Sequence, residues 1–80
     1  MDDLETVRTL LNDISSLLAG KPPQVQGAVL ADLLARWLAG HIDLDSSSKT
    51  DKLREEILRE HLDVIRKLVP VNAKTIGLPH

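Results

Sequence analysis

The segment from Val25 to His41, VQGAVLADLLARWLAGH, constrains the fold of this chain more than any other. Its only charged side chains at neutral pH, Asp32 and Arg36, stand at i, i+4 and so share one line of a helix. Leucines and Trp37 fill a wide arc opposite that line, and alanines occupy most of the rest. A helix that is apolar nearly all round must be covered on several sides. The segment therefore predicts a central helix over about residues 23–39.

The composition of the 80-residue chain indicates one small all-α domain. It contains one Trp and no Phe or Tyr, which suits helices better than sheets. A domain this short has a marginal core. The chain has no cysteine, which excludes disulfides and thiolate sites and favours a reducing compartment. Because oligomerisation is then the remaining stabiliser, the composition favours a homo-oligomer.

The N-terminal residues and the net charge bear on location and partners. Asp2, Asp3 and Glu5 stand where a secretory signal peptide would carry Lys or Arg. The central segment is shorter than the roughly 20 residues that cross a bilayer, and it contains two charges. A net charge of −2 argues against a non-specific polyanion binder. We expect a cytoplasmic protein that binds neither membrane nor nucleic acid.

Local signals predict a helix on the N-terminal side of the central one. Asp2 followed by Glu5 is a pattern typical of an N-cap, and apolar residues then recur at steps of three and four. Gly20 is placed as a left-handed C-cap, and Pro22 and Pro23 preset the first turn of the next helix. We predict a first helix over about residues 3–19.

The second half of the chain is expected to hold one more helix. Residues 42–50, IDLDSSSKT, are polar and without periodicity, so they are predicted to be a linker. Over residues 51–69, apolar side chains fill one half of a helical wheel and charged side chains fill the other half. This pattern predicts a helix over about 51–69, capped by Ser48 or Thr50. Pro70 is predicted to end that helix. Residues 70–80 are then expected to form an irregular tail.

We predict an all-α three-helix bundle, in which an antiparallel hairpin of the first two helices packs on the third. Its apolar faces are too many for one small monomer, so we predict a homodimer with the central helix at the contact. Gly27, Ala31 and Ala35 would permit close approach of another backbone, and Trp37 is the expected anchor. The residues predicted at the contact are Gly27, Leu30, Ala31, Leu34, Ala35, Trp37 and Leu38.

His61 is the candidate for a metal or acid/base site, because it lies in the apolar arc of the third helix. Its neighbours at i±3 and i±4 are aliphatic, so a metal site would have to recruit His41 or His80 from elsewhere. The competing interpretation is a packed histidine that is hydrogen-bonded to a backbone carbonyl or an acid. We predict no metal and no cofactor, and keep the site of His61 and His41 as an alternative.

The linker resembles the start of a calcium loop, with Asp43, Asp45 and Ser47 at alternating positions. That pattern requires glycine where Ser48 stands and a bidentate glutamate where Arg54 stands. An acidic linker explains these residues without an ion. No phosphate-binding glycine loop, nucleophile elbow or zinc-binding helix motif occurs in the chain, so nothing in it nominates an enzyme.

A small nucleic-acid-associated regulator is the second alternative, because two helices joined by a short turn resemble a helix-turn-helix. A recognition helix exposes a row of Arg, Lys, Asn or Gln, whereas the central helix offers only Gln24, Gln26 and Arg36. The third helix has more bases, but acids interleave with them.

PPQVQ at residues 22–26, leading to WLAGH at residues 37–41, resembles segments of small uncharacterised bacterial helical proteins. The resemblance covers about half the chain and implies a helical domain of unknown function. The prediction that best fits all these features is a small helical protein-interaction or structural module. Its partner would be a second copy of the chain or a helix of another protein, and no small-molecule ligand is evident.

Overall fold

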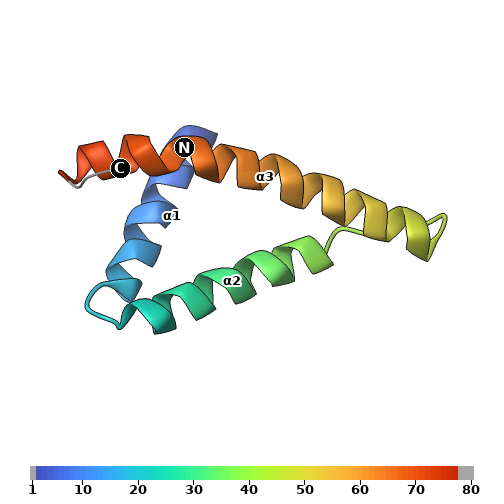
Figure 1. Cartoon of the computed structure of the whole chain (residues 1–80), viewed down its shortest axis with the longest axis horizontal. Helices are drawn as coiled ribbons and strands as arrows, with labels where there is room; N and C mark the ends of the chain where they lie inside the picture. The colour runs from blue at the N-terminus through green and yellow to red at the C-terminus, as the bar shows by residue number, and fades with distance from the viewer. Residues whose placement is uncertain (1, 78–80) are drawn as a thin grey trace. The chain divides into compact units, whose positions relative to one another are not determined.

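The computed structural model describes residues 2–77, which contain three helices and no strand: α1 (Asp3–Leu18), α2 (Pro23–Ala39) and α3 (Ser47–Thr75) (Figure 1). The predicted all-α architecture of three helices is confirmed. The chain divides between Leu33 and Leu34 into two compact units, so α2 contributes residues to both. None of the helices in the described part is long and apolar enough to cross a bilayer.

Local capping explains where α1 begins and ends. A carboxylate oxygen of Asp2 accepts a hydrogen bond from the backbone N–H of Glu5 at 2.8 Å, which confirms the predicted N-cap. Gly20 adopts the predicted left-handed conformation, with φ at +76°. The side-chain amide of Gln26 donates to the carbonyl of Leu18 at 2.8 Å. This bond satisfies one of the carbonyls that the end of a helix leaves without an intrahelical partner.

The predicted linker over residues 42–50 is too long, because α3 begins at Ser47. The hydroxyl of Ser46 accepts a hydrogen bond from the backbone N–H of Lys49 at 3.1 Å, and Ser46 has the extended backbone of an N-cap. Ser46 therefore caps α3, in place of the predicted Ser48 or Thr50.

The prediction that Pro70 ends the third helix is wrong, since α3 continues through it to Thr75. A proline cannot donate to the carbonyl four residues earlier, so one helical hydrogen bond is lost. The next turn of the helix keeps its backbone hydrogen bonds: the N–H of Ile76 donates to the carbonyl of Asn72 at 3.0 Å. The helix ends before Gly77, whose φ is +78°. Residues 70–75 are thus helical, and residues 78–80 of the predicted tail lie outside the described residues.

Replacing Pro70 with alanine is expected to stabilise α3. Alanine restores the missing N–H and removes the clash of the proline ring with the preceding turn, effects that together amount to about 1–3 kcal/mol. Urea unfolding followed by circular dichroism should show this gain. Lys67→Ala, at an exposed site of the same helix, is the control and should change the free energy of unfolding by less than about 0.5 kcal/mol. A Pro70→Ala protein no more stable than the parent would contradict a continuous helix at this position.

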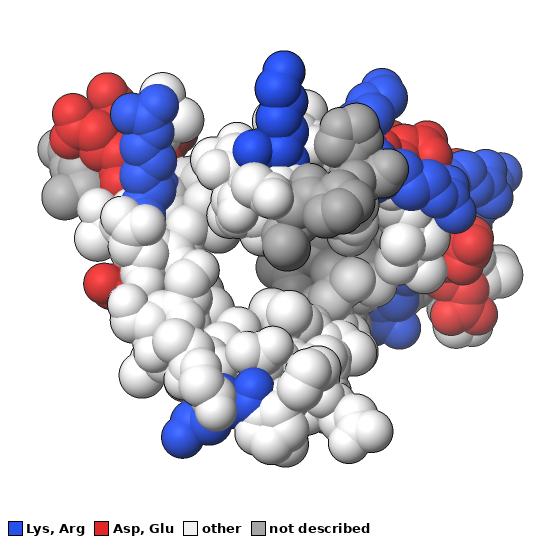
Figure 2. Space-filling model, turned by 60° about the vertical axis from the view of Figure 1, so that its left-hand side comes forward, with Lys and Arg blue, Asp and Glu red and all other residues white. Residues whose placement is uncertain are grey.

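Burial in this chain is slight. Among residues 2–77, no apolar side chain is buried, and Thr50 is the one buried polar residue. Half-buried apolar side chains gather in the unit that begins at Leu34, from the end of α2 and the first half of α3: Leu34, Leu38, Leu53, Ile57 and Leu58. On the face drawn in Figure 2, uncharged side chains make up much of the surface between the charged ones. Much apolar surface is therefore left in contact with water.

Candidate functional site

Three aromatic rings meet in the unit that begins at Leu34, and they include both histidines that the sequence singled out. The ring centroids of Trp37 and His41 are 4.7 Å apart, and those of Trp37 and His61 are also 4.7 Å apart. The interplanar angles of 77° and 70° make both contacts edge-to-face, a favoured arrangement for aromatic pairs. Trp37 thus joins the end of α2 to the middle of α3. We call these three residues the ring cluster.

In each histidine, one ring nitrogen lies within hydrogen-bonding distance of the backbone carbonyl four residues earlier. Nδ1 of His41 lies 2.8 Å from the carbonyl oxygen of Trp37, and Nδ1 of His61 lies 2.8 Å from that of Ile57. Because a carbonyl can only accept, we assign the hydrogen to Nδ1 in both rings, which leaves the lone pair of the neutral form on Nε2. Each histidine therefore has a backbone carbonyl as its hydrogen-bond partner, which is what a histidine with a packing role needs.

Metal-binding groups of three or more His, Cys, Asp or Glu residues do not occur within residues 2–77. The ring cluster brings together two imidazoles, whereas a zinc site takes three or four protein ligands. In the linker, a carboxylate oxygen of Asp43 accepts a hydrogen bond from the N–H of Asp45 at 2.9 Å. The carboxylate of Asp45 forms an exposed ion pair with Lys49, also at 2.9 Å. These two carboxylates therefore have structural partners within the linker and the first turn of α3.

Arg54 supports the ring cluster by holding the end of α2 against α3. Its Nε–H donates to the carbonyl of His41 at 3.0 Å, and its Nη2 donates to the carbonyl of Ala39 at 2.7 Å. Charged donors at a helix C-terminus satisfy its open carbonyls and interact favourably with the helix dipole. Sequence reasoning missed this role, because no local pattern pairs an arginine with carbonyls 13 and 15 residues earlier.

Thr50 makes a second connection between the linker and α3. Its hydroxyl accepts a hydrogen bond from the N–H of Asp43 at 2.8 Å and donates to the carbonyl of the same residue at 3.0 Å. This reciprocal pair explains why a threonine is the one buried residue among residues 2–77, since its hydroxyl both donates and accepts a hydrogen bond.

The predicted contact residues of α2 differ in exposure. Leu30 and Trp37 are exposed, at 51% and 43%, whereas Leu34 and Leu38 are half-buried. A Cβ added at Gly27 would meet nothing within 4 Å, so this glycine is not required by packing within the chain. The large apolar side chains of α2 that are exposed are Val25, Val29, Leu30, Leu33 and Trp37. By helical spacing they span an arc of about 140°, which Arg36 interrupts between Val25 and Val29 and which overlaps the predicted contact at Leu30 and Trp37.

Comparison of the chain with protein-family models, with curated proteins and with solved structures gave no match. The function proposed below therefore depends on the residues and geometry of this chain alone.

Proposed function

We propose that this chain is a cytoplasmic self-associating module, not an enzyme, and that it acts as a homodimer with α2 at the contact. The exposure of the apolar arc on α2 carries this proposal: Trp37, the only large aromatic side chain, is 43% exposed, although two other rings pack against it. Large aromatic side chains dominate protein interfaces, and an exposed apolar surface is typical of a binding site.

The energetics of covering this arc agree with a dimer that forms at moderate concentration. Full burial of a large apolar side chain contributes about 1.5–3 kcal/mol, so each half-exposed residue has roughly 1 kcal/mol left to gain. Five such residues on each of two copies would contribute about 10 kcal/mol. Association costs about 4–15 kcal/mol in lost freedom of motion. The arc on α2 is thus sufficient for a weak dimer, and a tighter one needs further contacts.

The native mass, measured by light scattering over a range of concentrations, tests the proposal. The variant Gly27→Leu tests whether this part of α2 lies at the contact. Because a Cβ added at Gly27 meets no other group of the described chain within 4 Å, a leucine there should stabilise α2 by about 1 kcal/mol through helix propensity. At a close contact between two copies the same side chain would obstruct association. We therefore expect Gly27→Leu to unfold at a higher temperature under dilute conditions and to weaken the dimer.

Ala28→Leu is the matched control, since Ala28 is also exposed on α2 but lies about 100° around the helix from Gly27, outside the predicted contact. It should leave the dissociation constant within about twofold of that of the parent protein. Equal effects of the two variants on association would place Gly27 outside the contact. A parent protein that stays monomeric at every concentration would overturn the proposed function.

A further inference from the structure

The exposed apolar arc of α2 carries one acid and one base along its edge. Asp32 and Arg36 are the only charged residues of α2, and both are exposed. They stand at i, i+4, so they lie about 40° apart around the helix. Arg36 falls between Val25 and Val29, and Asp32 lies just beyond Val25. We call Asp32 and Arg36 the charged edge of α2; it carries both signs of charge and no net charge.

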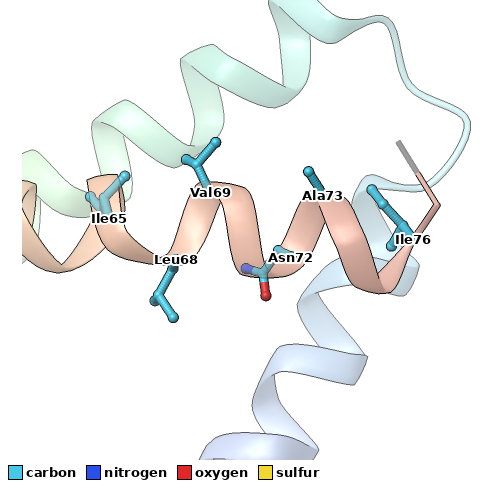
Figure 3. Close-up of a pocket in the computed structure, with 6 residues that line it drawn as sticks. All are labelled: Ile65, Leu68, Val69, Asn72, Ala73 and Ile76. Carbon is cyan, nitrogen blue, oxygen red and sulfur yellow. The ribbon is translucent and has the colours of Figure 1, made fainter. Parts of the chain in front are cut away.

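A second exposed apolar surface, on the second half of α3, lacks this balance (Figure 3). Six residues line a groove there, which has a volume of about 380 Å³: Ile65, Leu68, Val69, Asn72, Ala73 and Ile76. The charged residues of α3 from position 64 to its end are Arg66, Lys67 and Lys74, and all three are basic. This groove therefore offers no acid to an identical surface, whereas the charged edge of α2 offers an acid and a base.

We propose that α2 pairs antiparallel with α2 of a second copy, so that Asp32 of each copy meets Arg36 of the other. This inference rests on the proposed self-association and assigns its orientation and register. Position 34 is midway between the two charges, so a two-fold axis at that level places each acid opposite a base. A parallel pair in register would bring acid to acid and base to base, which is unfavourable across an interface. The antiparallel pair is self-complementary, as an isologous contact must be.

Helical geometry keeps this contact clear of the other helices. Leu34 and Leu38, the half-buried leucines of α2, belong to the unit that contains α3. Arg36 lies about 160° around the helix from both of them, and Leu33 lies at least about 100° away. The side chain of Gln26 is hydrogen-bonded to the end of α1, roughly 12 Å along α2 from the level of the axis. A second α2 at the charged edge therefore approaches from a side that α3 does not cover.

The same register covers apolar side chains of the exposed arc. Position 37 of one copy faces position 31 of the other, so Trp37 meets the adjacent Leu30 of the second copy. Close to the axis, the two copies of Leu33 meet each other. All three side chains are exposed in the single chain. One arrangement thus pairs the charges of α2 and removes apolar surface from water.

Charge reversal separates a pairing between copies from any contact within one copy. One variant carries Asp32→Arg and the other carries Arg36→Asp, so each has a charged edge of a single sign. Each alone should self-associate at least about tenfold more weakly than the parent. Mixed together they should form a one-to-one heterodimer, detected by native mass spectrometry, because the acids of one variant then face the bases of the other. Neither chain of that heterodimer has an acid and a base on its own charged edge, so contacts within one copy do not explain the recovery.

Single cysteines test the orientation, because the chain contains no cysteine of its own. Leu33 and Val25 are a matched pair of sites on α2, since both are 48% exposed. In the antiparallel pair, the two copies of Leu33→Cys lie near the axis and should form a disulfide under mild oxidation. The two copies of Val25→Cys would be roughly 27 Å apart, given a rise of about 1.5 Å per residue, and should not cross-link. Cross-linking of Val25→Cys as fast as Leu33→Cys would overturn the antiparallel pairing.

The outcomes separate this inference from the proposed function. If the parent is dimeric but both reversed variants dimerise as well as it does, or their mixture gives no heterodimer, the pairing is overturned and self-association stands. If the parent is monomeric at all concentrations, both are overturned. A heterodimer from two variants that are separately monomeric supports both.

Discussion

Replacing Arg54 with methionine is expected to lower the free energy of unfolding by about 2 kcal/mol. The variant keeps the aliphatic stem but loses the two hydrogen bonds to the carbonyls of Ala39 and His41. Hydrogen bonds from charged groups contribute about 1.5–3 kcal/mol, and the cation also interacts with the C-terminal dipole of α2. The site is only half-buried, which favours the lower part of that range. Urea unfolding followed by circular dichroism gives the value directly.

Arg54→Lys separates the geometry of the guanidinium from its charge. Lysine keeps the positive charge but cannot direct two N–H donors at two carbonyls in a fixed fork. We expect it to recover about half of the loss seen with methionine. A methionine variant within about 0.5 kcal/mol of the parent would show that this arginine does not hold α2 to α3.

Replacing Trp37 with alanine is expected to weaken self-association by about 30-fold or more. Truncating a central aromatic side chain of an interface costs about 2 kcal/mol or more, and 1.4 kcal/mol corresponds to a factor of ten. The same variant should also unfold more easily, by about 1–3 kcal/mol, because both edge-to-face contacts of the ring cluster are lost. Sedimentation equilibrium measures the first effect, and dilute urea unfolding measures the second.

Leu44→Ala is the matched control for Trp37→Ala, since Leu44 is 91% exposed and lies in the nearby linker. It should change neither the dissociation constant nor the free energy of unfolding. Trp37→Phe keeps a ring and should fall between parent and alanine in both measurements. If Trp37→Ala destabilises the fold but leaves association unchanged, the tryptophan is a packing residue of the monomer, and α2 does not contact the second copy through it.

The sequence predicted those features of this chain that depend on contacts within a few residues. The N-cap at Asp2, the left-handed Gly20 and the bounds of α2 all follow from signals that act within about one helical turn. Pro70 shows the limit of such reasoning. Its local signal is strong, but it removes a single hydrogen bond, and the next turn of α3 tolerates that loss.

Only the tertiary structure decided how the end of α2 meets α3, because those contacts join residues far apart in the sequence. Arg54 reaches carbonyls 13 and 15 residues earlier, and Trp37 meets the ring of His61 from a different helix. Composition and periodicity identified Trp37 as an interface anchor, and named His61 with His41 as the members of an alternative site. They could not place them around one ring, since side-chain periodicity describes the face of a helix and not its neighbour. The helices of this chain are thus a local property, whereas its candidate site is a property of the fold.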